Sequence, residues 1–222
     1  MFERVARMRT RCLVAFAWCV LCVSCYGPTH ERPHVDRELE ERVDAWESAR
    51  RDGDSGRDQR EQLEQLALRH PAHASTLLAC GFVAHEDRDV EGAQRWLDAA
   101  LRLQPRNADA TWLRACIALE LGNLPAAERM TEQQLRSVPD HAGLHEMQAS
   151  VRYFQGDLKG ARESLERAET LGAPGWRVQY HLGLIAEGLG ELEKAREHYD
   201  RCLEERPKHD RARSRRNALR LD

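Results

Sequence analysis

A few residues in this 222-residue sequence have types and spacings that could support chemistry. His141 and His145 are four residues apart, so on a helix both imidazoles would lie on one face, as two metal ligands do. Neither an HExxH motif nor a third ligand accompanies this pair. The sequence therefore predicts no metal site.

Patterns of catalytic residues are also missing. The sequence contains no Ser-His-Asp or Cys-His signature, no phosphate-binding loop and no paired carboxylates in a catalytic context. We therefore expect no catalytic residues and no cofactor, and we expect that the protein is not an enzyme. A hydrolase or a metal-dependent enzyme is the weaker alternative.

The cysteines concentrate at the N-terminus. Four of the seven lie within the first 25 residues, and only Cys80, Cys116 and Cys202 lie further along the chain. These three form no CxxC pair, so neither a zinc site nor a thiol redox motif is indicated. We expect them to be small buried residues at helix contacts.

Residues 1–24 have the pattern of a signal peptide. Four arginines precede the uncharged apolar run LVAFAWCVLCV at residues 13–23, which is shorter than the roughly 20 residues that a membrane-spanning helix needs. The following segment, LCVSC at residues 21–25, resembles a bacterial lipobox. This resemblance implies that Cys25 becomes the first residue of the mature protein and carries acyl chains that anchor it to a membrane.

The location implied by this resemblance is the bacterial cell envelope. Because Tyr26 rather than Asp follows Cys25, the resemblance to bacterial lipoproteins favours the periplasmic face of the outer membrane. Cleavage without lipidation, which would give a periplasmic or secreted protein, and an uncleaved anchor are the alternatives.

The charge of the chain argues against one class of partner. The formal net charge is -3, and residues 1–24 hold four arginines and Glu3, so a chain without them has a net charge of -6. Nonspecific nucleic-acid binding depends on clustered positive charge. We therefore expect no nucleic-acid partner.

An internal repeat predicts the helices that would carry the residues considered above. From residue 74 the sequence divides without insertion into blocks of 34 residues: 74–107, 108–141, 142–175 and 176–209. Small residues occupy positions 8 and 20 of every block, and Gly122, Gly156 and Gly190 occupy position 15 of the last three. Proline occupies position 32 in three blocks.

This pattern resembles the tetratricopeptide repeat, a helix-turn-helix unit, in four consecutive copies. The resemblance implies an all-α fold, a right-handed α-solenoid. Small residues at positions 8 and 20 let the two helices of a unit approach closely, and a larger residue at position 24 fills the space beside them. Glycine at position 15 permits a positive φ where the first helix ends, and proline at position 32 closes the second helix.

The flanking segments complete the expected domain order. Residues 25–35 form a linker after the lipidated cysteine, residues 36–73 form a degenerate repeat-like cap, and residues 210–222 form a C-terminal capping helix. Ala212, Leu219 and Leu221 are expected to cover the last repeat.

Some residues depart from the repeat pattern. Arg88 replaces the turn glycine in the first block, and Thr131 and Gln134 place polar side chains in the second. We therefore expect a loosened interface between the second and third repeats.

The resemblance also implies a binding surface. In this family, positions 2, 5, 9, 12 and 13 of the first helices form a concave groove, and their spacing places them on one stripe of each helix. The block positions predict the following groove residues: Leu78, Phe82 and His85; Trp112, Cys116 and Leu119; Glu146, Ser150, Tyr153 and Phe154; Tyr180, Leu184 and Glu187.

Such a groove is apolar and aromatic with an acidic rim. It suits an amphipathic helix or an extended peptide, with Trp112, Tyr153 and Tyr180 as anchors. Contacts between neighbouring repeats are the alternative use of Leu78, Leu119 and Leu184.

One kind of groove is excluded by the same positions. The clamp with which some members of the family hold a peptide carboxylate resembles a set of Lys, Asn and Arg in the first helices. The corresponding places here hold Leu78, Phe82, Leu113, Gly143 and Met147, and we identify no cation among them.

Together these patterns predict a non-enzymatic scaffold at the bacterial cell envelope. Its partners would be a protein or peptide in the groove, and the membrane through the N-terminal lipid anchor. An assembly lipoprotein resembling the tetratricopeptide pilotins, which help a pilus or secretion ring reach the outer membrane, is the alternative.

Overall fold

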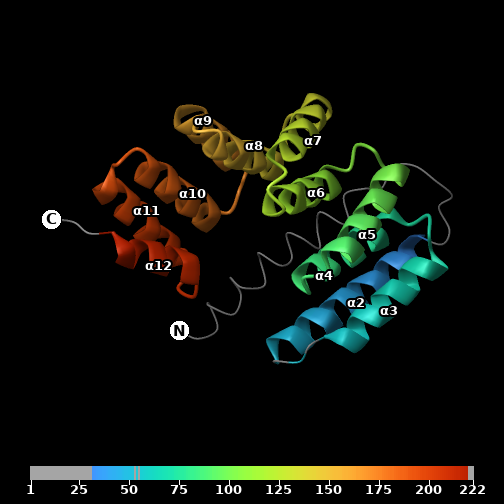
Figure 1. Ribbon diagram of the computed structural model, residues 1–222. Coiled ribbons are helices and arrows are strands. Elements are labelled where there is room, and N and C mark those ends of the chain that lie inside the picture. Colours follow the sequence, from blue (N-terminus) through green and yellow to red (C-terminus); the bar gives the residue numbers. More distant parts are fainter. Residues whose placement is uncertain (1–31, 53, 55, 220–222) are drawn as a thin grey trace. The chain divides into compact units, whose positions relative to one another are not determined.

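The computed structural model describes residues 32–52, 54 and 56–219, in which all regular structure is helical (Figure 1). The helices are α2 (Arg32–Arg51), α3 (Arg57–Arg69), α4 (Ala74–Glu86), α5 (Val90–Leu103), α6 (Ala108–Glu120), α7 (Leu124–Ser137), α8 (Ala142–Phe154), α9 (Leu158–Thr170), α10 (Gly175–Gly188), α11 (Leu192–Glu205) and α12 (Asp210–Ala218). The all-α prediction is confirmed. The expected signal peptide, Cys25 and Leu221 lie outside the described residues.

The chain divides into two compact units, residues 1–110 and residues 111–222, with the division near the start of α6. Helices α4 and α5 pack together as a hairpin in the first unit. Helices α8 and α9, and then α10 and α11, do so in the second. The first helices of the four hairpins begin at residues 74, 108, 142 and 175, which are the block starts of the repeat except that α10 begins one residue early.

The turn inside each hairpin uses a residue in the left-handed region of backbone space. Gly122, Gly156 and Gly190 have φ angles of 74°, 83° and 76°. Arg88 takes the same place in the first hairpin with a φ of 64°, a conformation that a side chain with a Cβ disfavours.

The second helix of three hairpins then starts with a side-chain cap that the sequence analysis did not use. Asp89, Asn123 and Asp157 accept hydrogen bonds from the backbone N–H three residues on, at 2.9, 3.2 and 2.9 Å. These caps satisfy an amide that would otherwise lack a partner in the first turn.

Close approach of the paired helices explains the small residues at position 8. A Cβ on Gly81 would lie 2.7 Å from Cγ of Leu97, and one on Gly183 would overlap the ring of Tyr199. Leu97 and Tyr199 are the residues at position 24, and both are fully buried. The packing predicted for these positions is therefore present in both hairpins.

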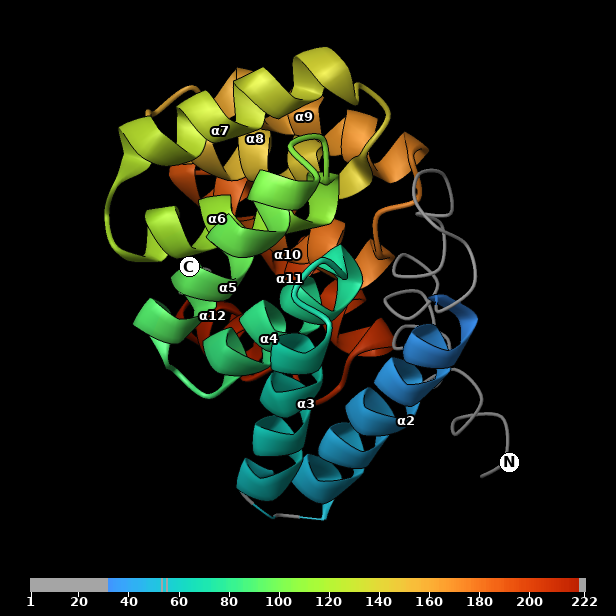
Figure 2. The ribbon, with the colours of Figure 1, turned by 90° about the vertical axis from the view of Figure 1, so that its right-hand side faces the viewer.

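In the first unit, α2 and α3 form a further helical hairpin, in which the two helices lie side by side in both views (Figures 1 and 2). Trp46 of α2 is buried and contacts Phe82 of α4 edge-on, with ring centroids 6.1 Å apart. The expected linker ended at residue 35, but α2 already begins at Arg32, and Val35 is buried. Pro33 does not prevent this, because proline is tolerated in the first turn of a helix.

In the second unit, apolar contact continues from the second repeat into the third. A cluster joins α6, α7 and α8: Ala115, Ala118, Ala126, Ala127, Met147 and Val151. Two polar residues that were expected to loosen this region, Thr131 and Gln134, are buried. The Thr131 hydroxyl donates to the carbonyl of Ala127 at 2.8 Å, whereas Nε2 of Gln134 has no hydrogen-bond partner among the described residues.

Helix α12 covers the end of the second unit. Ala212 is fully buried in a cluster with Tyr199 and Cys202 of α11, and Leu219 packs against the same cluster. Within the described residues, every helix is too short or too polar to cross a lipid bilayer.

Candidate functional site

The expected groove residues are divided between the two units. Leu78, Phe82 and His85 belong to α4 in the first unit, and the others belong to α6, α8 and α10 in the second. Each unit therefore presents its own part of the first-helix stripe.

In the first unit, Leu78 is not available to a partner. Its side chain is 4% exposed and belongs to the core, so the expectation that it lines a groove is corrected. Phe82 and His85 remain half-buried, and Phe82 is held by its contact with Trp46. The position of Leu78 in the stripe thus serves packing, as the alternative interpretation proposed.

In the second unit, one arginine connects all three first helices. The Arg177 guanidinium in α10 binds both carboxylate oxygens of Glu146 in α8, with Nε 3.1 Å from Oε1 and the second nitrogen in close contact with Oε2. Its central carbon lies 5.5 Å from the ring centroid of Trp112 in α6, a cation–π contact. Glu146 is 3% exposed, so it lies beneath the surface and not on the groove rim as expected.

Arg177 was missed by the sequence analysis. It occupies position 2 of the fourth block, within the stripe that the family uses, and this position was a signal that could have identified it. The five positions compared with a carboxylate clamp, which hold no cation, did not include Arg177. This cation does not face a ligand, however, because its hydrogen-bonding edge is used by Glu146.

The middle of the stripe keeps several half-buried side chains. Cys116 and Leu119 of α6 pack at the edge of the cluster that joins α6 to α8. In α8, the Ser150 hydroxyl donates to the carbonyl of Glu146 at 3.1 Å. Beside it, Tyr153 contacts Phe154 edge-on at 5.6 Å, and Phe154 is 63% exposed. Phe154 is therefore the most accessible aromatic side chain of the predicted groove.

Tyr180 and Leu184 of α10 are half-buried at the end of the stripe, against the cluster under α12. Near them, Glu187 accepts a hydrogen bond from the Tyr199 hydroxyl at 2.7 Å and pairs with Arg215 at 3.2 Å. Burial, and then this hydrogen bond, raises the pKa of Tyr199. Since Glu187 has these internal partners, as Glu146 does, the expected acidic rim is largely neutralised.

The two histidines with metal-ligand spacing have structural uses. Nδ1 of His141 accepts a hydrogen bond from the backbone N–H of Leu144 at 3.2 Å and so caps α8. Nε2 of His145 lies 2.8 Å from the carbonyl oxygen of Pro139, to which it donates. In the part of the chain that the structure describes, no three His, Cys, Asp or Glu side chains gather as metal ligands would.

The three cysteines in the helices are free thiols. Cys80 and Cys202 are buried, as expected, and Cys116 is half-buried. Burial raises the pKa of Cys80 and of Cys116 to about 12, and that of Cys202 to about 11. These thiols are therefore poor nucleophiles at neutral pH.

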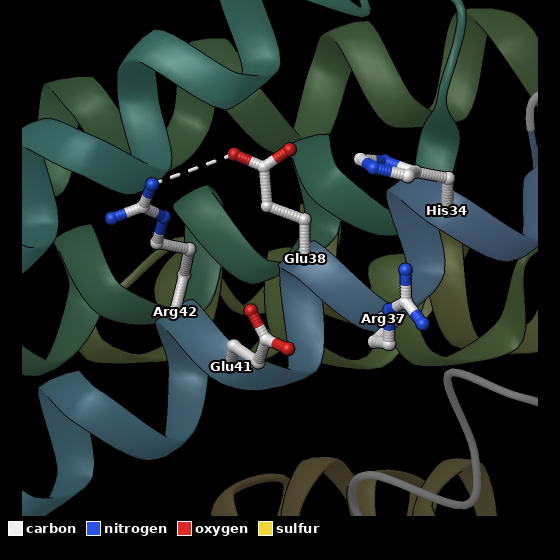
Figure 3. A pocket seen from close by; sticks show the side chains of 5 residues that line it. All are labelled: His34, Arg37, Glu38, Glu41 and Arg42. Carbon is white, nitrogen blue, oxygen red and sulfur yellow. Dashed lines mark hydrogen bonds and ion pairs between the residues drawn. The ribbon is translucent and has the colours of Figure 1, made fainter.

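A hollow on the first unit has a different character from the groove (Figure 3). Its lining residues all come from α2: His34, Arg37, Glu38, Glu41 and Arg42. Glu38 pairs with Arg42 at 3.5 Å and with Arg69 of α3 at 2.8 Å. The hollow is a charged surface of one helix and lacks the apolar side chains that a buried peptide anchor requires.

Consecutive helical hairpins with glycine turns, small residues at the helix contact and a 34-residue period define a helical repeat protein. A family model described as "Tetratricopeptide repeat" matches residues 77–142 and 146–210, more than half of the chain. The chain belongs to the tetratricopeptide repeat family.

Similar proteins agree with this assignment. Tetratricopeptide repeat protein 36 of Bos taurus is 34% identical over 105 residues, which are 46% of this chain and 56% of that protein. The Mus musculus protein of the same name is 32% identical over 103 residues, 45% of this chain and 55% of its own length. The chain thus spans about half the length of the curated relatives it matches.

Solved structures show the same fold. TTC0263, a tetratricopeptide repeat protein of Thermus thermophilus, has a TM-score of 0.69 and 18% identity, covering 82% of this chain and 98% of that chain. MamA of Desulfovibrio magneticus RS-1 has a TM-score of 0.55 and 17% identity, covering 78% and 97%. A chain of the Cut9–Hcn1 hetero-tetramer has a TM-score of 0.69 and 13% identity, covering 73% and 32%.

Proposed function

We propose that this chain is a non-enzymatic scaffold that binds a protein or peptide along the first-helix stripe of its second unit. Proteins of the tetratricopeptide repeat family bind protein partners, and the fold is generally a non-catalytic scaffold. The Cut9–Hcn1 hetero-tetramer is an assembly of two kinds of chain that contains a similar repeat array. The exposed aromatic side chain of Phe154, next to half-buried Tyr153, is the observation that carries the proposal for this chain.

The first-helix stripe of the second unit is preorganised for binding. Helices α6, α8 and α10 are linked by Arg177 and Glu146, so the stripe is held in place before a partner arrives. Little ordering cost remains to be met on binding, and aromatic side chains give large contact areas for few rotatable bonds. A partner would bury the exposed face of Phe154 and the accessible parts of Tyr153 and Leu184.

Site-specific photo-crosslinking tests this proposal. The full-length protein is produced in its own organism with a photoreactive benzoylphenylalanine in place of Phe154, or in place of Leu68 as a control. Leu68 is also exposed, but it lies on α3 in the first unit. We expect a discrete adduct with another protein at position 154 and none at position 68. Equal adducts at both positions, or none at position 154, would contradict the proposal.

We further propose that the protein is exported and held at the bacterial envelope by lipid on Cys25. The support is the arginine-rich start, the short apolar run at residues 13–23 and the lipobox-like residues 21–25. Metabolic labelling with an alkyne palmitate analogue should mark the wild type but not Cys25→Ala. Labelling that persists in Cys25→Ala would refute the anchor, and Cys22→Ala serves as the matched control.

A further inference from the structure

The arginines at the C-terminal end of the second unit differ in their partners. Residues 206–219 hold six Arg or Lys residues and one acidic residue, Asp210, in a chain whose net charge is -3. Three arginines of α12 have carboxylate partners: Arg213 with Asp210 at 2.9 Å, Arg215 with Glu187 at 3.2 Å, and Arg216 with Asp200 at 2.7 Å. Arg211 is exposed, and among the described residues no carboxylate pairs with it.

Arg206, at the end of α11, is held against an aromatic ring. Its guanidinium carbon lies 4.1 Å from the ring centroid of Trp176 in α10. An arginine over an aromatic face can still use its N–H donors for a carboxylate, because the contact involves the face of the guanidinium and the donors lie in its plane. The nearby Glu205 carboxylate accepts instead from the backbone N–H of Trp176 at 3.0 Å.

Three aromatic rings pack together beside Arg206. The ring centroid of His209 is 4.7 Å from that of Tyr180 and 5.5 Å from that of Trp176. Burial, and then the charge of Arg206, lowers the pKa of His209, whose Nδ1 accepts from the Ala212 N–H and caps α12. Burial raises the pKa of Tyr180, and the positive charges of Arg211 and Arg215 oppose this rise.

The geometry therefore defines a surface that we name the corner patch: Trp176, Tyr180, Arg206, His209 and Arg211. Its rings are half-buried and its two arginines are exposed. Trp176 and Tyr180 lie in α10, Arg206 and His209 lie in the segment that joins α11 to α12, and Arg211 lies in α12. The cations come from the end of the second helix and from the capping helix, not from the first helices.

We propose that the corner patch docks an acidic protein segment, in which Asp or Glu carboxylates bind Arg206 and Arg211 while a neighbouring apolar side chain packs on Trp176 and Tyr180. The inference rests on the proposed protein-binding function and names the chemistry of the partner. Charge complementarity supports it, since guanidinium–carboxylate hydrogen bonds are short and charge-assisted. A polyanion fits less well, because its affinity grows with each phosphate neutralised, and three arginines of α12 are already paired.

Peptide binding to the full-length protein in detergent provides the test. The probe is a fluorescein-labelled peptide of alternating Glu and Leu residues, followed by fluorescence anisotropy, and a Lys-for-Glu peptide is its counterpart. The variant R206Q/R211Q is compared with R213Q/R216Q, which removes the same charge from the same region. We expect R206Q/R211Q to weaken the affinity for the Glu peptide by at least about tenfold, the scale of one lost charge-assisted hydrogen bond. R213Q/R216Q should change this affinity far less.

Equal losses in the two double variants, or equal binding of the Lys peptide, would overturn the corner patch. Tighter binding to phosphatidylserine vesicles or to single-stranded DNA than to the Glu peptide would also overturn it. Crosslinking at position 154 keeps the two proposals separate. An unchanged adduct in R206Q/R211Q, together with unchanged binding of the Glu peptide, refutes the patch and leaves the groove intact. If the protein with its wild-type arginines gives no adduct at position 154, while R206Q/R211Q still weakens binding of the Glu peptide, the groove is refuted and the patch stands.

Discussion

The ion pair between Arg177 and Glu146 gives the sharpest test of how the second unit is held together. Glu146 is 3% exposed, whereas the Arg177 side chain is 30% exposed. Arg177→Met would leave a buried carboxylate without its cation, a loss of about 3–5 kcal/mol for pairs of this kind. It would also remove the cation–π contact with Trp112, which contributes about 0.5–1 kcal/mol.

Partial exposure of Arg177 lets water replace some of the lost interaction, so we expect the low end of this range, about 3 kcal/mol. Replacing both partners, as in Glu146→Met with Arg177→Met, removes the unpaired charge. The double variant should therefore lie within about 1 kcal/mol of the wild type. Arg162 and Glu191 provide the control, because their side chains are 3.5 Å apart but 40% and 32% exposed. Arg162→Met should destabilise the protein far less than Arg177→Met, because exposed ion pairs contribute little.

Urea and thermal unfolding of the full-length chain, followed by far-ultraviolet circular dichroism, measure these differences. A loss of about 3 kcal/mol corresponds to a Tm lower by roughly 10 °C in a unit of this size. The reasoning is refuted if Arg177→Met is no less stable than Arg162→Met. It is equally refuted if the double variant is as unstable as Arg177→Met alone.

Three further predictions concern single side chains. Gln134→Met removes a buried Nε2 that has no hydrogen-bond partner among the described residues, so the free energy of unfolding in urea should rise by about 1 kcal/mol, while the same change at exposed Gln133 should have no effect. Burial lowers the pKa of His181 from 6.5 to about 4. The neutral ring therefore adds up to about 3 kcal/mol to the free energy of unfolding at neutral pH, and this stabilisation is lost as pH falls from 6.5 toward 4. Thermal melts at pH 7 and pH 4.5 should accordingly differ less for His181→Gln than for the wild type, and an equal difference would contradict this account. Arg88→Gly should raise Tm by relieving the left-handed backbone, with a gain of about 0.5–1 kcal/mol, and a lower Tm would contradict this account.

Much of the fold was predictable because its determinants are local. Glycine at position 15 of three repeats predicted a turn with a positive φ, and Gly122, Gly156 and Gly190 adopt it. Small residues at position 8 predicted close helix contact, and Gly183 lies under Tyr199. The start of α2 was placed too late because Pro33 was interpreted as part of a linker, although proline is also common in the first turn of a helix.

The candidate site was less predictable. The stripe of the first helices followed from helical periodicity, so Phe154 and Tyr180 were found. Periodicity does not tell whether a side chain on the stripe points to water or into a neighbouring repeat, and Leu78 and Glu146 are buried. The corner patch was missed because the family pattern directs attention to the first helices, and Arg206 lies outside them.

The amino-acid sequence by itself determined the period of 34 residues, the places where helices end and the pairs of helices that approach closely. These depend on backbone conformation and on side-chain size within about one repeat, and both can be read from neighbouring positions. Only the tertiary structure decided which charges meet. Arg177 reaches Glu146 and Trp112, which are 31 and 65 positions away in the chain, because stacking of repeats sets the distances between their side chains. At such separations each arginine has several possible partners, and packing selects among them.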